Sequence, residues 1–102
     1  MADFVKVAQA SDLALNSAKT VKVNGTDVAL VNLAGQFYAI GDTCPHAHCS
    51  LGDGDVEGEN IVCPCHASEF NIKTGAVEDG PAREGVPSYQ VRVDGDDILV
   101  VV

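Results

Sequence analysis

The four cysteines and three histidines of this chain all fall in one short window, from Cys44 to His66, and the rest of the chain contains neither residue type. Thiolates and imidazoles are the side chains that bind zinc, copper and iron-sulfur clusters. In an intracellular chain, crowded Cys and His predict a metal site before they predict a disulfide framework. The remaining residues are therefore expected to form a frame that holds this window in place.

The residues before the window predict paired β-strands. Residues 19–23 alternate between polar and apolar side chains, and Asn24-Gly25 favours a two-residue hairpin loop of type I′. Residues 26–33 continue as a largely apolar run, which Ala34-Gly35 turns into residues 36–40. We expect three consecutive antiparallel strands that deliver the chain to Cys44.

The residues after the window also predict strands. Residues 89–93 alternate, Asp94-Gly95 is a second hairpin signal, and residues 98–102 close a β pair. Helix is expected only as a single turn near residues 11–15, where Ser11 or Asp12 would cap it.

Short strands are also predicted inside and just after the window. Gly58-Glu59-Asn60 predicts a short hairpin, and residues 69–72 predict a strand that turns at Lys73-Thr74-Gly75 into Ala76-Val77. Without a long helix, this spacing predicts an all-β fold, a small antiparallel sandwich or open barrel. A chain of 102 residues has room for one domain, residues 1–102, in which two loops form a cluster-binding subdomain at about residues 42–82.

The charge of the chain excludes several classes of partner. Fifteen acids against six bases give a formal net charge of -9, which disfavours nucleic acid and anionic membrane surfaces. The longest apolar run, residues 98–102, is far shorter than the roughly 20 residues of a membrane-spanning helix, and the first residues do not resemble a signal peptide. We therefore expect a cytoplasmic protein without a membrane anchor.

The spacing within the window favours two irons over one zinc. Zinc ligands usually come as a Cys pair followed by a His pair, whereas Cys44-Pro45-His46 and Cys63-Pro64-Cys65-His66 each mix the two types. With C-x-H in one loop and C-x-x-H in the other, each loop could give its Cys to one iron of a binuclear cluster and its His to the other. His48 is expected to lie near the site without binding metal. A zinc-bound interaction module remains the alternative.

At these residues the sequence resembles the Rieske 2Fe-2S proteins, whose motif is C-x-H followed by C-x-x-H. The resemblance covers about residues 37–102. Within the family, the sequence most resembles the Rieske ferredoxins of bacterial aromatic ring-hydroxylating dioxygenases. Further matching positions are Gly52-Asp53-Gly54, Phe70, Thr74-Gly75 and Gly80-Pro81-Ala82. The resemblance implies one 2Fe-2S cluster, with Cys44 and Cys63 on one iron and His46 and His66 on the other. Since His48 has no counterpart in the motif, the resemblance also implies that it does not bind metal.

The resemblance also implies roles for residues around the cluster. Cys49 and Cys65 depart from the dioxygenase ferredoxins and match the loop-bridging disulfide of respiratory Rieske proteins; two reduced thiols are the alternative in a reducing cytosol. Ser68 matches a serine that donates a hydrogen bond to a cluster sulfide, and Phe70 replaces a tyrosine donor. Pro81 belongs to a third loop near the cluster. The glycines at positions 52, 54 and 80 are expected in turns with positive φ.

The function implied by the resemblance is electron transfer. The chain would pass single electrons from an NAD(P)H-dependent flavoprotein ferredoxin reductase to a terminal ring-hydroxylating oxygenase, and it is not itself expected to be an enzyme. Acidic residues between Lys22 and Lys73 would make the encounters transient and electrostatic. These are Asp27, Asp42, Asp53, Asp55, Glu57, Glu59 and Glu69. A Rieske-like small subunit of nitrite reductase or another redox enzyme, and a soluble protein of respiratory type, are alternatives.

Overall fold

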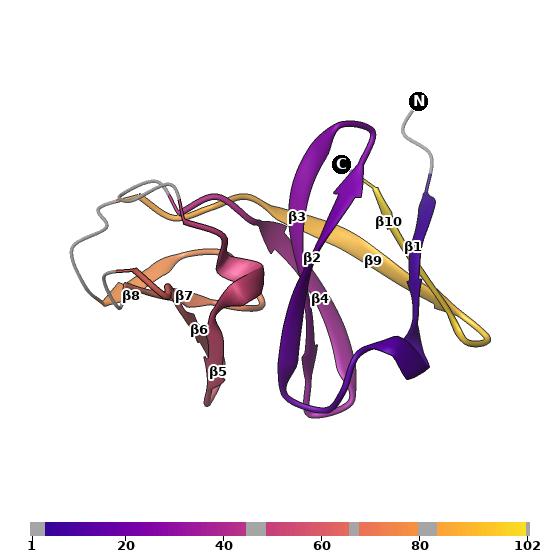
Figure 1. Cartoon of the computed structure of the whole chain (residues 1–102), viewed down its shortest axis with the longest axis horizontal. Helices are drawn as coiled ribbons and strands as arrows, with labels where there is room; N and C mark the ends of the chain where they lie inside the picture. Colours follow the sequence, from indigo (N-terminus) through magenta and orange to yellow (C-terminus); the bar gives the residue numbers. More distant parts are fainter. Residues whose placement is uncertain (1–3, 45–48, 66–67, 80–83, 102) are drawn as a thin grey trace.

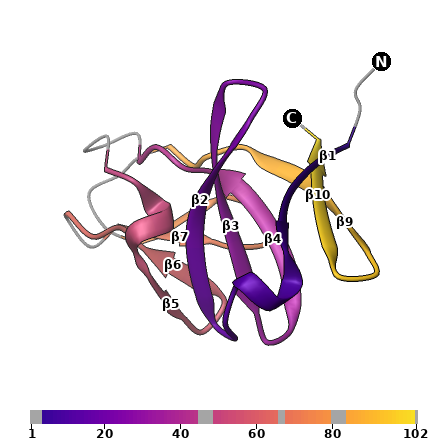
Figure 2. The same ribbon diagram turned by 45° about the vertical axis from the view of Figure 1, so that its right-hand side comes forward.

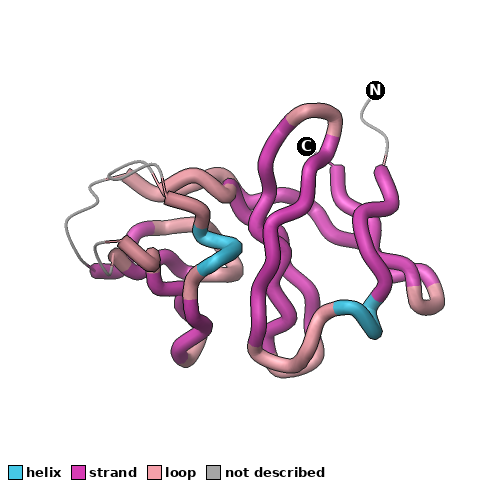
Figure 3. Tube along the Cα trace, viewed as in Figure 1, coloured by secondary structure: helices cyan, strands magenta, loops and turns pink. Residues whose placement is uncertain are grey.

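The computed structural model describes residues 4–44, 49–65, 68–79 and 84–101, and in these ranges it is built from short and medium antiparallel strands (Figure 1). Two single 3-10 turns, η1 and η2, are the helical elements of the same ranges (Figure 3). The elements in chain order are β1 (Val5–Gln9), η1 (Ala10–Asp12), β2 (Ser17–Val23), β3 (Thr26–Leu33), β4 (Gln36–Gly41), η2 (Leu51–Asp53), β5 (Asp55–Glu57), β6 (Asn60–Val62), β7 (Glu69–Asn71), β8 (Val77–Asp79), β9 (Ser88–Asp94) and β10 (Asp97–Val101).

Six of the strands form an antiparallel sheet in the order β1-β10-β9-β4-β3-β2. The two outer strands of this sheet, β1 and β2, approach each other, so the sheet curls into a nearly closed barrel (Figure 2). An antiparallel sheet that closes on itself buries one face and protects its edges. The predicted all-β fold class, a small open barrel, is confirmed.

The two hairpins before the window follow from local turn chemistry. In the β2–β3 loop, Asn24 and Gly25 have φ of 49° and 84°, and in the β3–β4 loop Ala34 and Gly35 have φ of 53° and 93°. Positive φ at both loop residues is what a type I′ turn requires, and Ala34 adopts it at some cost because of its Cβ. The Ala34 N–H donates to Asn16 Oδ1 at 2.9 Å, which helps to hold the second loop in place.

Three details differ from the sequence-based expectation. Strand β1 was not predicted, because its partner β10 lies at the other end of the chain and no local pattern reveals that pairing. The last hairpin turns at Gly95-Asp96, one residue later than the Asp94-Gly95 signal, since Asp94 pairs with Asp97. The helical turn begins at Ala10, where the Gln9 N–H donates to Asp12 Oδ2 at 3.2 Å. Among the described residues, no helix is long and apolar enough to span a membrane.

The other four strands form a second antiparallel sheet in the order β5-β6-β7-β8, to the left of the barrel in Figure 1. This sheet lies in the segment 42–87, which leaves the barrel after β4 and returns at β9. The two ends of the segment meet, because the Gly41 N–H donates to the Pro87 carbonyl at 2.8 Å and β4 then pairs directly with β9. The segment is therefore an insertion between two neighbouring barrel strands.

Strand β3 contributes to two hydrophobic cores at once. Val28 and Leu30 point into the barrel, whereas Ala29 and Val31 on the opposite face pack against the insertion. All four are fully buried. A strand buried on both faces reads as a continuous apolar run rather than an alternating one, which explains the pattern of residues 26–33. Strand β3 therefore gives the inserted sheet an apolar surface of the barrel to pack against.

Candidate metal centre

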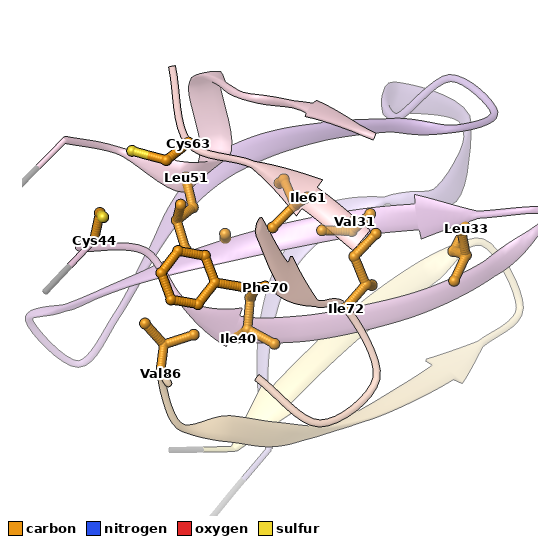
Figure 4. Packing of buried hydrophobic residues seen from close by; sticks show 11 residues of the cluster. Val31, Leu33, Ile40, Cys44, Leu51, Ile61, Cys63, Phe70, Ile72 and Val86 are labelled. Carbon is orange, nitrogen blue, oxygen red and sulfur yellow. The ribbon is translucent and has the colours of Figure 1, made fainter. Parts of the chain in front are cut away.

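Two buried free thiols, those of Cys44 and Cys63, lie at one end of the core between the barrel and the inserted sheet. Their exposed fractions are 0% and 1%. Figure 4 shows the two cysteines on the same side of this core, beside Leu51 and the ring of Phe70. Cys44 follows β4 and Cys63 follows β6, so two segments that are far apart in sequence bring soft metal donors to one place.

Each thiol stands at the start of a loop that is closed by a main-chain hydrogen bond. The Cys44 N–H donates to the Cys49 carbonyl at 2.9 Å, and the Cys63 N–H donates to the Ser68 carbonyl at 2.8 Å. An isolated β-bridge between Thr43 and Ser50 reinforces the first closure. The backbone entering and leaving residues 44–49, and likewise 63–68, is therefore fixed at the base of each loop. We call these segments the first and the second loop.

A disulfide between Cys49 and Cys65 joins the two loops. The Cα atoms of the pair are 6.3 Å apart, and the bond closes a sequence separation of 16 residues. This is the pairing implied by the resemblance to respiratory Rieske proteins. Because these two sulfurs are bonded to each other, the thiols that remain for a metal are those of Cys44 and Cys63.

The imidazoles of the predicted site lie outside the described residues. His46 and His48 fall in residues 45–48, His66 in residues 66–67, and Pro81 in residues 80–83. Within the described ranges no group of three or more His, Cys, Asp or Glu side chains gathers as a metal site. The described half of the donor set is two buried, unbonded thiols at the base of two joined loops, which fits the thiolate ligands of an iron-sulfur cluster. The four-residue ligand set stays a prediction.

Of the residues predicted beside the cluster, Ser68 and Phe70 are buried near the thiols, whereas the two glycines after the first loop do not have the predicted backbone conformation. Ser68 is fully buried at the end of the second loop, and Phe70 on β7 is fully buried against the same core as the thiols. Gly52 and Gly54 were expected at positive φ, and this is wrong: neither has it, and Gly54 has φ of -83°. They are needed because a Cβ on Gly52 would collide with the Thr20 backbone and one on Gly54 with the Val62 carbonyl. The segment just after the first loop is thus packed tightly, against β2 at Gly52 and against β6 at Gly54.

The acidic residues of the insertion divide into exposed and buried members. Asp53, Asp55, Glu57 and Glu59 are exposed along η2, β5 and the turn after it, as expected for a charged surface. Asp42 is different, because its side chain is only 5% exposed, and the expectation that it belongs to that surface is wrong. The only local signal for its burial is its place between a strand and Cys44.

A cleft of about 460 Å³ lies between the barrel and the inserted sheet, away from the thiols. It is lined by residues of the β3–β4 and β5–β6 hairpins, including Leu33, Tyr38 and Val56. The lining contains none of the predicted site residues. The described part of the candidate centre is therefore the pair of loops and not this cleft.

Comparison with known proteins agrees with the fold. Residues 3–90 match the family model described as "Rieske [2Fe-2S] domain". The "3-phenylpropionate/cinnamic acid dioxygenase ferredoxin subunit" of Escherichia coli (strain K12) is 42% identical over 74 residues, which cover 72% of this chain and 70% of that protein.

Solved structures give the same result. The ferredoxin of carbazole 1,9a-dioxygenase from Nocardioides aromaticivorans IC177 superposes with a TM-score of 0.90 at 35% identity, covering 95% of each chain. A chain in a complex of reduced oxygenase and oxidized ferredoxin in carbazole 1,9a-dioxygenase gives a TM-score of 0.89 at 32% identity, covering 96% of this chain and 92% of that one.

Proposed function

The chain belongs to the Rieske [2Fe-2S] domain family, and from this membership we propose that it is a one-electron carrier, the ferredoxin component of an aromatic-ring dioxygenase system. The family gives the chain one Rieske-type 2Fe-2S cluster as its cofactor. The observation that carries the proposal is the pair of buried free thiols at the base of two joined loops, in a chain 42% identical to a dioxygenase ferredoxin subunit.

Four side chains are proposed to hold the cluster. Cys44 and Cys63 would bind one iron as thiolates, and His46 and His66 would bind the other through imidazole nitrogens. When bound, a cluster of this type accepts one electron and gives it up again, and its two imidazole ligands raise its potential above that of an all-thiolate centre. The protein contributes the position, the surroundings and the exposure of the centre.

The described side chains near the thiols give the centre an apolar inner side. Leu51, Phe70 and Val86 share a buried core with Cys44 and Cys63 (Figure 4). Apolar packing on this side excludes water, and the barrel behind it keeps a partner protein from approaching the centre closely from that direction. The electron would therefore enter and leave on the side of the two loops, where Cys65 is exposed.

The proposed partners are a flavoprotein reductase, which uses NAD(P)H, and a terminal oxygenase. The complex of oxygenase and ferredoxin in carbazole 1,9a-dioxygenase supports an oxygenase as the acceptor. Residues 42–86 hold nine of the 15 acids and two of the six bases of the chain, which favours basic partner surfaces and weak, salt-sensitive encounters. We place the protein in the cytoplasm with these partners.

Reconstitution tests this proposal. The purified chain would be analysed for iron, sulfide and zinc, then mixed with the reductase and oxygenase of a carbazole or phenylpropionate dioxygenase and NADH. We expect two irons and two sulfides per chain, reduction by the reductase, and oxygenase turnover that requires the chain. A C44S/C63S variant is the matched control and should support none of these steps.

Other outcomes would favour the alternatives. A colourless chain that holds one zinc would overturn electron transfer and indicate an interaction module. A reducible cluster with no transfer to any oxygenase, in a chain that co-purifies tightly with a large reductase subunit, would indicate a small subunit of nitrite reductase or another redox enzyme.

A further inference from the structure

Asp42 is a buried carboxylate at the point where the barrel ends and the first loop begins. Its Oδ1 accepts hydrogen bonds from Thr20 Oγ1 at 3.0 Å and from the Gly52 N–H at 2.8 Å, and its Oδ2 accepts one from Ser50 Oγ at 2.7 Å. Thr20 belongs to β2 of the barrel, whereas Ser50 and Gly52 follow the first loop. One side chain therefore links the far end of the loop to a barrel strand.

The main chain of Asp42 makes the same connection. Its N–H donates to the Asp27 carbonyl at 3.3 Å, which fixes it to β3, and its carbonyl accepts from the Leu51 N–H at 2.7 Å. Leu51 is fully buried in the core that contains Cys44 and Cys63. Both the side chain and the backbone of Asp42 thus hold the return of the first loop against the barrel, two residues before Cys44.

Gly52, just after the first loop, is packed closely against β2. Gly52 lies so close to Thr20 that a Cβ on the glycine would overlap the Thr20 backbone and hydroxyl. Hydrogen bonds to a buried acceptor are worth more than exposed ones, because a donor that loses its acceptor there stays unsatisfied. Removing the carboxylate would leave the buried Gly52 N–H without its acceptor and free the loop to move away from β2.

The number of protons shared by the oxygen atoms around Asp42 shows which substitution would preserve these hydrogen bonds. Thr20 Oγ1 and Ser50 Oγ lie 2.7 Å apart, in addition to their contacts with the carboxylate. Three oxygen pairs are then within hydrogen-bond distance, but the two hydroxyls supply only two protons. An asparagine amide at position 42 would keep an acceptor for Thr20 and Gly52 and bring an N–H toward Ser50, so that every contact is satisfied.

We propose that Asp42 is the positioning residue of the first loop: it holds residues 50–52 on β2 and β3 and thereby sets where Cys44 lies relative to the second loop. What the loop holds, a 2Fe-2S cluster, rests on the proposed function. Asp42 itself is not proposed to bind metal. Its role is to fix the end of the first loop on the barrel, so that Cys44 keeps its place in the core that it shares with Cys63.

Three variants of the full chain test this role. D42A removes the acceptors, D42N keeps them in nearly the same shape, and N32A is the matched control at the other end of the barrel. Asn32 is also buried, at 7% exposure, and it also bonds two separate segments, since its Nδ2 donates to the Leu13 carbonyl and its Oδ1 accepts from the Gly35 N–H.

We expect D42A to lose most of its iron and sulfide, to shift the visible and EPR spectra of the cluster that remains, and to exchange the Leu51 and Gly52 amide hydrogens about tenfold faster than the parent chain. D42N should restore the iron content, the spectra and the slow exchange. N32A should lower the unfolding midpoint without changing the spectra. Equal iron loss in D42A and N32A, or a D42A protein with the parent spectra and exchange, would overturn the proposal.

Milder variants keep the test decisive if D42A does not fold. T20V and S50A each remove one hydroxyl and should speed exchange at Gly52, most of all when combined. Unchanged exchange in the double variant would again contradict the role. Amide exchange is measured at Leu51 and Gly52, directly after the first loop, and it does not require a bound cluster. A chain that binds no cluster can therefore still show that Asp42 holds this segment, which separates this proposal from the proposed function.

Discussion

The barrel and the insertion are both antiparallel sheets, but they reach their structures by different means. The barrel strands are five to eight residues long, and the longest ladder, between β2 and β3, pairs every residue of β2; the strands surround a core that includes Val23, Leu30 and Ile98. Each strand of the insertion has three residues, too few to define a register through pairing alone. Besides its hydrophobic core, the insertion depends on single contacts, including a disulfide, glycines without room for a Cβ, and the hydrogen bonds of Asp42.

This difference separates stability from placement. Many equivalent apolar contacts stabilise the barrel, so each is replaceable by another of similar volume. A metal centre needs its donors at defined positions, and a few specific contacts fix positions better than a uniform core does. The four predictions below, ordered by expected effect, test whether the two regions respond to change in these two ways.

Truncation of one large, fully buried side chain in each region should give the largest effects. F70A in the insertion should lower the free energy of unfolding by about 3–5 kcal/mol, and L30A in the barrel by about 2–5 kcal/mol, since both side chains are fully buried. Urea denaturation measures both values. F70A alone should also reduce the iron per folded chain, because Phe70 shares a core with Cys44 and Cys63. Equal iron loss in L30A would remove the distinction between the regions.

Removal of the disulfide should have the next largest effect. C49A/C65A opens a connection that spans a sequence separation of 16, for which loop-closure entropy gives a loss of about 3 kcal/mol. Denaturation under oxidising conditions checks this value, and the parent chain treated with a reductant is the control that should match the variant. If parent and variant unfold at the same denaturant concentration, the bond does not constrain the two loops.

A pair of glycine substitutions should separate strain from crowding. Gly75 in the insertion and Gly25 in the barrel have similar φ, 79° and 84°. A Cβ on Gly75 would collide with the Val86 carbonyl, whereas a Cβ on Gly25 would meet no atom within 4 Å. G75A should therefore destabilise the protein by about 1–3 kcal/mol more than G25A, the usual cost of forcing extra atoms into a packed site. Thermal or urea unfolding of the two variants gives the difference directly. Equal losses would mean that positive φ alone matters at both sites.

Loss of one exposed ion pair in each region should have the smallest effect. Lys73 Nζ lies 3.6 Å from Glu59 Oε2 in the insertion, and Lys6 Nζ lies 3.1 Å from Asp97 Oδ1 in the barrel. Because all four side chains are about half exposed, K73M and K6M should each cost less than about 1 kcal/mol, and less still at high salt. A larger loss in K73M, measured by urea unfolding at two salt concentrations, would make surface charge another of the specific contacts of the insertion.

The two regions also differ in how far their structure was predictable from sequence. The barrel hairpins were predictable, because Asn24-Gly25 indicates its turn type locally, residues 19–23 before it alternate, and residues 26–33 after it form an apolar run. Strand β1 was not, since Val5 pairs with Val100 and nothing near Val5 indicates that partner. Local signals thus define elements and hairpins, whereas closure of the barrel depends on pairing across the whole chain.

At the candidate centre, prediction worked for the residues whose chemistry is rare. Four cysteines in one short window predict a metal site or a disulfide. The structure places two of them as free buried thiols and two in a disulfide. Asp42 and Gly52 were assigned other roles, because an aspartate or a glycine is common in loops and its role here depends on Thr20, 22 residues before Asp42. His46 and His66 remain predictions.

The way the insertion joins the barrel bears on protein engineering. Its ends meet at Gly41 and Pro87 and interrupt a pairing, β4 with β9, that continues beside them, so the segment could in principle be cut out or transplanted like a cassette. The obstacle is the outer face of β3, where the buried Ala29 and Val31 pack against the inserted segment. A recipient barrel must offer an equally apolar strand, and a barrel stripped of its cassette would expose a sticky surface that favours self-association.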